Sequence, residues 1–161
     1  MDNYMKLEIA AIGENESFAR SAVAAFALSL NPSLTELSDI KTAVSEAVTN
    51  CIVHAYKKQG ADNRILIECR AEKTSQRIPV WGILHIQITD YGCGIADIEQ
   101  ATTPFFTTLE SEERSGMGFT IMQTFMSDFS VESRPGEGTK VRMRKNIGLM
   151  ENENVKEALH A

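Results

Sequence analysis

The chain has 161 residues, of which 43% are hydrophobic and 24% charged, a composition that supports one domain with a continuous core. Its formal net charge of −6 argues against a general nucleic-acid binder and favours a protein partner. The sequence contains no run of about 18 apolar residues and no basic-then-apolar leader, so we expect a cytoplasmic protein without a membrane span. The three cysteines form no C-x-x-C pair, which argues against a disulfide framework or a zinc site.

The first third of the sequence predicts one strand and two helices. Alternating apolar residues favour a strand over 5–10, and an amphipathic pattern favours a helix over 14–30. The sequence Ser33-Leu-Thr-Glu36 is typical of a capping box, in which a hydroxyl and a carboxylate satisfy backbone amides at the start of a helix. We therefore expect a long second helix that begins here and extends to Tyr56.

The rest of the sequence predicts four more strands and one more helix. Alternation favours strands over 64–71 and 83–90, joined most simply as a hairpin. Phenylalanine and methionine residues at helical spacing predict a helix over 119–129. Strands over 130–134 and 139–145 follow, connected by a Pro-Gly-Glu-Gly turn.

These elements assemble most economically as a two-layer α/β (α+β) sandwich. We expect a mixed, mostly antiparallel sheet of about five strands covered by about three helices. Residues 1–147 would form this single domain, and residues 148–161 would be a marginally ordered tail. Residues 94–116 show no steady periodicity, so we interpret them as a segment that closes over a bound ligand.

The second helix carries an unusual polar row. Between Thr42 and Tyr56 the only Asp, Glu, Lys or Arg is Glu46, and at about 100° per residue Glu46, Asn50 and His54 lie on one face. A carboxylate and an amide oxygen one turn apart can hold a magnesium ion and accept a proton. The alternative is a mostly buried helix whose polar row is satisfied internally.

A second candidate is the sequence Asp90-Tyr-Gly92-Cys-Gly94, at the end of the strand over 83–90. Alternation places Asp90 on the core face, where a carboxylate requires partners. The two glycines permit close backbone approach by a flat base or a phosphate. The alternative is a simple glycine-rich turn.

A third candidate is Ser115-Gly-Met-Gly118, a glycine loop that opens the helix over 119–129. Free amides and the positive end of the helix dipole favour phosphate there. The alternative is that the glycines only admit the chain into the helix. Neither a G-x-x-x-x-G-K-[ST] nor a G-x-G-x-x-G motif is present, so P-loop and dinucleotide sites are excluded on spacing.

Five sequence boxes together resemble the ATPase/kinase superfamily that includes DNA gyrase, the heat-shock chaperone and histidine kinases (GHKL type). They are Glu46-Ala-Val-Thr-Asn50, Asp90-x-Gly-x-Gly94, Pro104-Phe-Phe-Thr-Thr108, Arg114-Ser-Gly-Met-Gly118 and Gly138-Thr139. Within the superfamily, residues 45–50 and 114–122 are most similar to the bacterial anti-sigma factor serine kinases, in particular to the sporulation branch. The resemblance covers roughly residues 5 to 146 and implies a Bergerat-type ATP-binding fold.

The resemblance also implies roles for individual residues. Glu46 would be the general base, Asn50 would hold Mg²⁺ with the triphosphate of ATP, and Asp90 would receive the adenine amino group. Thr139 would support the adenine through water. The remaining implied ATP/ADP contacts are Gly92, Gly94 and Ile95 at the base, Thr107, Thr108, Arg114, Ser115, Gly116, Met117, Gly118 and Phe119 at the phosphates, and His54.

The partners implied by the resemblance are proteins. The phosphate acceptor would be a serine of a small anti-anti-sigma (STAS-type) protein, and an RNA polymerase sigma factor would be held inactive on a homodimer. The first strand and helix are the expected dimer seat, and Arg20 on that helix is a candidate partner contact. A lone arginine on a helix is also often a solvated surface residue.

Two other functions remain as alternatives. The first is a nucleotide-gated binding module in which Glu46 does nothing catalytic, and the second is a histidine-kinase catalytic domain without its phosphoacceptor. Two features depart from the family pattern: the connection over 72–82 is longer than expected, and Cys93 lies within the Asp-x-Gly-x-Gly turn. The connection either forms a partner surface or packs on the sheet, and Cys93 is either a reactive thiol or an ordinary small residue.

Overall fold

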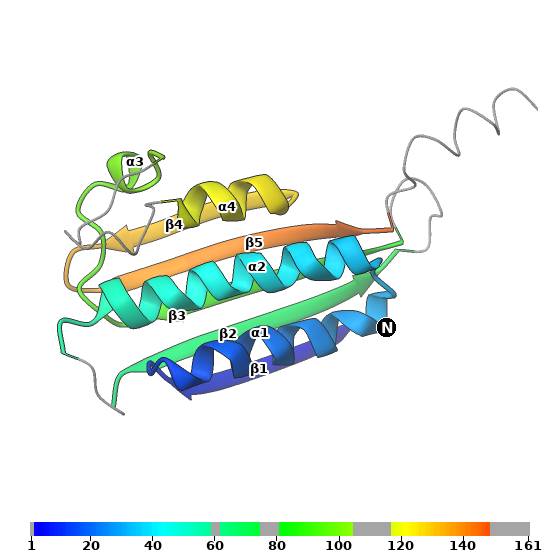
Figure 1. Ribbon diagram of the computed structural model, residues 1–161, viewed down its shortest axis with the longest axis horizontal. Helices are drawn as coiled ribbons and strands as arrows, with labels where there is room; N and C mark the ends of the chain where they lie inside the picture. Colours follow the sequence, from blue (N-terminus) through cyan, green and yellow to red (C-terminus); the bar gives the residue numbers. More distant parts are fainter. Residues whose placement is uncertain (1, 59–61, 75–80, 105–116, 149–161) are drawn as a thin grey trace, which may run out of the picture.

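The computed structural model describes residues 2–58, 62–74, 81–104 and 117–148, which form one antiparallel sheet with helices on one face (Figure 1). The described strands are β1 (Asn3–Ala10), β2 (Arg64–Lys73), β3 (Gly82–Asp90), β4 (Asp128–Arg134) and β5 (Gly138–Ile147). Their order in the sheet is β1-β2-β3-β5-β4, and each neighbouring pair is antiparallel. The predicted α/β sandwich is therefore confirmed.

The helices form the second layer. The described α-helices are α1 (Glu14–Ala27), α2 (Leu34–Asn50), α3 (Ile98–Ala101) and α4 (Gly118–Phe125), and the short turns are η1 (Leu28–Leu30) and η2 (Cys51–Ala55). Helices α1, α2 and α4 lie side by side over the sheet, with α2 in the middle (Figure 1). None of the described helices is long and apolar enough to cross a membrane.

The core lies between α2 and the middle of the sheet. Strands β2 and β3 alternate strictly, so that Ile67, Ile86 and Ile88 are buried on the helix side. Val44 and Val48, one turn apart on α2, belong to the same buried cluster. Each such side chain stabilises the fold by about 1.5–3 kcal/mol when it is fully buried.

Helix α2 begins and ends for identifiable reasons. The predicted capping box is present, since Ser33 Oγ accepts from the Glu36 amide at 3.1 Å and Glu36 Oε2 accepts from the Ser33 amide at 2.7 Å. The α-helix ends at Asn50, and Cys51–Ala55 continues as one π-helical turn before Tyr56 becomes extended. Turns of this kind are frequent at functional sites.

The predicted helix over 119–129 is too long. Helix α4 ends at Phe125, Met126 is extended, and Phe129 lies in β4, where it pairs with Met143 of β5. The rings of Phe119 and Phe129 are in contact at a centroid distance of 5.8 Å. The aromatic spacing that indicates one helix thus arises from a short helix that packs against the following strand.

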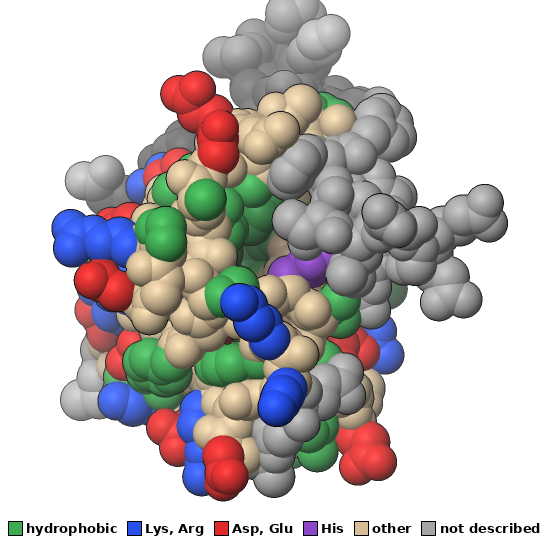
Figure 2. Space-filling view, turned by 90° about the vertical axis from the view of Figure 1, so that its left-hand side faces the viewer, with side chains coloured by type: hydrophobic (Ala, Val, Ile, Leu, Met, Phe, Trp, Pro, Cys, Tyr) green, Lys and Arg blue, Asp and Glu red, His purple; other side chains and the backbone are tan. Residues whose placement is uncertain are grey.

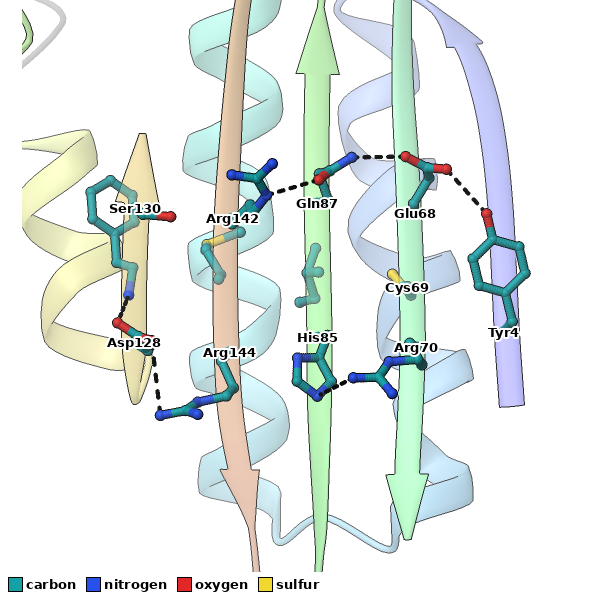
Figure 3. A pocket seen from close by; sticks show the side chains of 13 residues that line it. Tyr4, Glu68, Cys69, Arg70, His85, Gln87, Asp128, Ser130, Arg142 and Arg144 are labelled. Atoms are coloured by element: carbon teal, nitrogen blue, oxygen red, sulfur yellow. Dashed lines mark hydrogen bonds and ion pairs between the residues drawn. The ribbon is translucent and has the colours of Figure 1, made fainter. Parts of the chain in front are cut away.

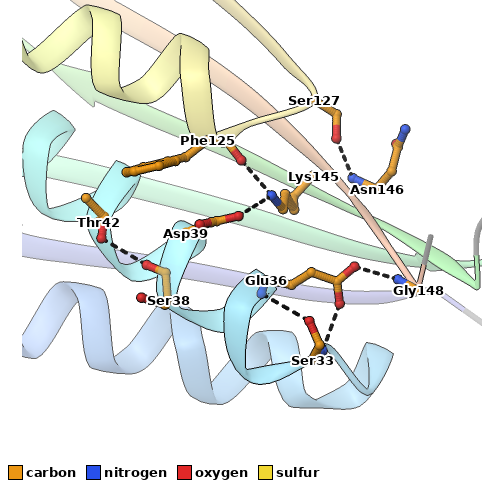
Figure 4. A network of polar contacts seen from close by, with 10 residues as sticks. All are labelled: Ser33, Glu36, Ser38, Asp39, Thr42, Phe125, Ser127, Lys145, Asn146 and Gly148. Atoms are coloured by element: carbon orange, nitrogen blue, oxygen red, sulfur yellow. Dashed lines mark hydrogen bonds and ion pairs between the residues drawn. The ribbon is translucent and has the colours of Figure 1, made fainter. Parts of the chain in front are cut away.

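A network of polar contacts fastens α4 to its neighbours. Lys145 Nζ on β5 donates to Asp39 Oδ2 on α2 at 2.8 Å and to the carbonyl of Phe125, the last residue of α4, at 2.6 Å (Figure 4). Lys145 and Asp39 are both mostly buried, which makes their ion pair stronger than a surface pair. Three elements are therefore joined by one ammonium group.

The opposite face of the sheet carries polar side chains, and the helices drawn in Figure 3 lie behind the sheet as this face is viewed. Glu68 accepts from Tyr4 at 3.1 Å and from Gln87 at 2.9 Å, and Arg142 donates to Gln87 at 3.0 Å. The row spans four adjacent strands and borders a shallow hollow of about 500 Å³. These contacts are solvent-accessible, so each stabilises the sheet only weakly.

The connection over 72–82 lies partly outside the described residues, including Ile78 and Val80. Trp81 is described: its amide donates to the Ile147 carbonyl at 2.9 Å, and its side chain is 55% exposed. The indole lies against Gly148, where an added Cβ would be 1.9 Å from Trp81 Cδ1. Trp81 thus packs part of its side chain against the domain and exposes the rest.

Candidate nucleotide-binding site

The helix and the strand that carry predicted site residues finish at the same end of the molecule. The end of α2, the end of β3 and the loop before α3 lie together at the left of Figure 1. Figure 2 faces this end and shows a hollow with hydrophobic side chains at its floor and a histidine near it.

The start of α4 lies against the polar row of α2. A Cβ added at Gly118 would be 3.2 Å from Glu46 Oε2 and 3.3 Å from Asn50 Nδ2. Glycine is therefore the residue that lets the first turn of α4 approach both side chains closely. Met117, the N-cap residue, does not cap this helix start with its own side chain, and the backbone amides in the first turn of a helix are suited to bind an anion. The structure thus brings together two candidates that are separated by about 70 residues in the sequence.

Asp90 is the buried acid of the site. Only 4% of this residue is exposed, and its Oδ1 accepts from the amides of Gly92 at 3.0 Å and Thr139 at 3.2 Å. Burial raises the pKa of the Asp90 carboxyl, and hydrogen bonds from Gly92, Cys51 and Thr139 lower it in part. A carboxylate has about four lone-pair sites, so Asp90 retains capacity to accept from a ligand amino group.

The buried Cys51 thiol supports this acid. Burial and the nearby Asp90 carboxyl raise the pKa of Cys51 well above its ordinary value, so the thiol remains protonated beside the acid. Cys93, in contrast, is exposed, and its Sγ lies 3.4 Å from the carbonyl of His54. His54 itself is half-buried in the η2 turn, beside the glycine-rich turn that follows β3.

The turn over 90–94 is interlocked with the hairpin between β4 and β5. An added Cβ at Gly94, whose φ is +72°, would lie 2.0 Å from the Arg134 carbonyl oxygen. A Cβ at Gly138, whose φ is +88°, would lie 2.1 Å from the carbonyl oxygen of Asp90. The Gly136 amide also donates to the Cys93 carbonyl at 2.7 Å. These glycines therefore have a packing role as well as any role toward a ligand.

Ser133 on β4 is a site residue that sequence reasoning missed. Its Oγ accepts from the Ile95 amide at 2.8 Å and lies 2.8 Å from Thr139 Oγ1. The signal available in the sequence was its alternation with Phe129 and Val131, which places a hydroxyl on the core face of that strand. The overextended helix prediction concealed this pattern.

The remaining predicted contacts divide into two groups. Met117 is the N-cap residue of α4 and Phe119 is half-buried in its first turn, so both lie at the helix start. Thr107, Thr108, Arg114, Ser115 and Gly116 lie outside the described residues, as does most of the predicted closing segment. The described part of that segment contains α3, which was not predicted.

The metal-ligand atoms that the described residues offer suit magnesium better than a metal held by several protein side chains. Within the described residues, no group of three or more His, Cys, Asp or Glu side chains gathers as a metal cluster. Magnesium is usually held by one or two protein oxygens together with waters and substrate phosphates. The Asn50 amide oxygen, adjacent to Glu46 and to the start of α4, fits that pattern.

Comparison with known proteins identifies the family of this domain. The family model of the histidine kinase-like ATPase domain matches residues 10–145. The fold is shared with a solved structure of the RsbU and RsbW domains of a Mycobacterium tuberculosis protein, with a TM-score of 0.61, 14% identity, and coverage of 90% of this chain and 32% of that one. The family model and the fold thus define a histidine kinase-like, GHKL-type ATPase domain.

More similar relatives identify the branch. The anti-sigma F factor of Caldanaerobacter subterraneus subsp. tengcongensis is 53% identical over 148 residues, which cover 91% of this chain and 96% of that protein. The anti-sigma F factor of Bacillus subtilis is 45% identical over 147 residues, which cover 91% of this chain and 94% of that protein. The chain belongs to the anti-sigma F factor family.

Proposed function

We propose that the protein is an ATP-dependent serine kinase whose substrate is a STAS-type anti-anti-sigma protein. The observation that carries this proposal is the approach of Gly118 to both Glu46 and Asn50. It gathers a candidate base, an oxygen ligand and an anion-binding helix start, which are the parts that phosphoryl transfer needs. Asp90, at the end of β3, would accept the amino group of adenine.

The proposed reaction follows from these positions. Glu46 accepts the proton of the acceptor serine as its oxygen bonds to the γ-phosphorus and the bond from that phosphorus to the β-γ bridging oxygen of ATP breaks. The amides at the start of α4 stabilise charge on the phosphate oxygens. Mg²⁺, when bound with the triphosphate, would neutralise further charge, and Asn50 is the residue that would hold it.

The second part of the proposal concerns the sigma factor. The relatives are named anti-sigma F factors, which supports binding and inhibition of a sporulation sigma factor by this chain in the cytoplasm. We further propose a homodimer seated on β1 and α1, with Arg20 on α1 as a partner contact. Arg20 has an exposed side chain and lies 3.7 Å from Glu16, which also accepts from Ser45 at 2.6 Å.

A nucleotide-gated binding module is the alternative function. It shares every nucleotide contact with the kinase and differs only in that Glu46 takes no proton. The two are separated by Glu46→Gln, which preserves size and polarity but removes the base.

The test incubates purified protein with labelled ATP, Mg²⁺ and the STAS-type protein from the same genome. Wild type is expected to transfer label to a serine, and Glu46→Gln is expected to bind ADP normally without transfer. Nucleotide binding without transfer in either protein would establish the gated module instead. Absence of nucleotide binding by wild type would refute both.

A further inference from the structure

Three polar residues face one another at the end of the sheet. In the strand register, Asp90 of β3 pairs with Thr139 of β5, and Thr139 pairs with Ser133 of β4. The next row inward consists of apolar residues, Ile88, Val141 and Val131. The core therefore ends in a row of one carboxylate and two hydroxyls, at the end of the sheet where the base would lie.

The hydroxyl of Ser133 has two possible hydrogen-bond acceptors but only one proton. It accepts from the Ile95 amide at 2.8 Å, and it lies 2.9 Å from the Gly138 carbonyl oxygen and 2.8 Å from Thr139 Oγ1. Since a hydroxyl has a single proton, Ser133 donates either to Gly138 or to Thr139. In the first arrangement Thr139 donates to Ser133; in the second, the proton of Thr139 is released for another acceptor.

We propose that Ser133 is a positioning residue for adenine recognition, which acts through the hydroxyl of Thr139. This inference rests on the proposed binding of ATP. Asp90 as a carboxylate can only accept hydrogen bonds, so it suits the amino group of adenine. The neighbouring ring nitrogen is an acceptor and requires a donor, which Thr139 supplies, directly or through water, when Ser133 donates to it.

The inference predicts a specific pattern of coupling. Ser133→Ala removes the partner of Thr139 and should weaken Mg-ATP binding about fivefold, the value of one neutral hydrogen bond. Thr139→Val keeps the shape of the side chain but removes its hydroxyl and should weaken binding similarly. Because Ser133 acts through Thr139, adding Ser133→Ala to Thr139→Val should produce no further loss.

The experiment measures dissociation constants for Mg-ATP by calorimetry for these three variants and for two controls. Ser133→Thr keeps the hydroxyl on a strand-favouring side chain and should bind as wild type does. Ser130→Ala lies on the same strand, on the outer face, and should change nothing. Melting temperatures of the ligand-free variants monitor folding, and Ser133→Cys replaces Ser133→Ala in the cycle if the latter unfolds.

The outcomes separate this inference from the proposed function. If wild type binds no ATP, the proposed function fails. If wild type binds ATP but Ser133→Ala binds equally well, or if its loss persists undiminished in the Thr139→Val background, Ser133 is not a positioning residue for the base. As a further check, purine riboside triphosphate lacks the amino group that Asp90 would accept. Ser133→Ala should weaken its binding by the same factor as for ATP.

Discussion

The buried thiol of Cys51 and the buried carboxyl of Asp90 lie close together, and each shifts the pKa of the other: Asp90 raises that of the thiol, and Cys51 lowers that of the carboxyl. This contact joins the helix that carries Asn50 to the strand end where the base would bind, because Cys51 follows Asn50 directly in the chain. The candidate metal ligand and the candidate base-recognition acid are thereby held in a fixed relation.

Asp90→Asn should weaken ATP binding without lowering the stability of the fold. Binding of ATP should weaken about 10- to 100-fold, because an amide NH₂ replaces an oxygen that would accept from adenine. Burial raises the pKa of the Asp90 carboxyl, so the folded state binds protons more tightly than the unfolded state, and ionisation at neutral pH opposes folding. The ligand-free variant should therefore melt at the same or a higher temperature than wild type at pH 7.

This stability difference should shrink as the pH falls toward the carboxyl's unfolded pKa, since wild-type Asp90 then becomes neutral in both states. Calorimetric melting at pH 7 and at lower pH checks the sign. A variant that is less stable than wild type at pH 7 would show that the carboxylate stabilises the fold, contrary to this expectation.

Gly118→Ala should impair nucleotide binding without harming the fold. The added carbon would meet Glu46 and Asn50 at 3.2–3.4 Å, which displaces the two side chains by a few tenths of an ångström. Alanine is also a better helix former than glycine by about 1 kcal/mol, so stability should not fall. Phosphoryl transfer to the STAS-type protein and the melting temperature are the two measurements.

Gly13→Ala is the control for this substitution, because nothing lies within 4 Å of its added carbon. It should leave transfer unchanged. Equal transfer by Gly118→Ala and wild type would mean that the start of α4 need not approach the polar row.

Gly94→Ala and Gly136→Ala form a matched pair that tests how much the packing between the interlocked turns contributes to the free energy of unfolding. Both glycines have positive φ, +72° and +80°, but only at Gly94 would the added carbon overlap another atom, the Arg134 carbonyl oxygen at 2.0 Å. Gly136→Ala should lower the free energy of unfolding by about 1–2 kcal/mol through backbone strain. Gly94→Ala should lower it by about 3 kcal/mol or more and abolish ATP binding. Urea denaturation provides both values, and similar values for the two would contradict the interlocking.

Arg20→Glu should weaken capture of the sigma factor and of the STAS-type protein while leaving ATP binding unchanged. The substitution reverses an exposed charge and places a second carboxylate beside Glu16. Lys41→Glu, an exposed charge reversal on α2, is the control. Pull-down of each partner by the two variants decides the matter, and undiminished capture by Arg20→Glu would discard a partner role for this residue.

The sequence predicted most of the fold because its patterns are local. The capping box at Ser33 and the alternation in β2 and β3 each lie within ten or so residues, and both are present. The inward position of Asp90 also followed from alternation and is confirmed by its burial. Element types with strong periodicity are the part of a fold that local reasoning predicts best.

The parts that were missed depend on contacts between distant segments. Phe129 matched a helical stripe, but tertiary pairing with β5 places it in a strand. Assigning Phe129 to the helix concealed the strand alternation that continues from it to Ser133. The packing of Gly94 under Arg134 joins two turns 40 residues apart, and no local pattern encodes such a contact. The sequence therefore predicts either a ligand contact or a simple turn for these glycines, and not their packing against the hairpin.

The two ends of helix α4 make different kinds of contact. Its last carbonyl is fastened by Lys145 to α2 and β5, and its first residue borders the side chains of Glu46 and Asn50. At 1.5 Å per residue its eight residues form a rod of about 12 Å. A tilt of about 10° about the fastened end would move the other end by about 2 Å. The displacement from a small tilt of this helix would therefore be largest at its first turn, the end at which the phosphates of ATP would bind.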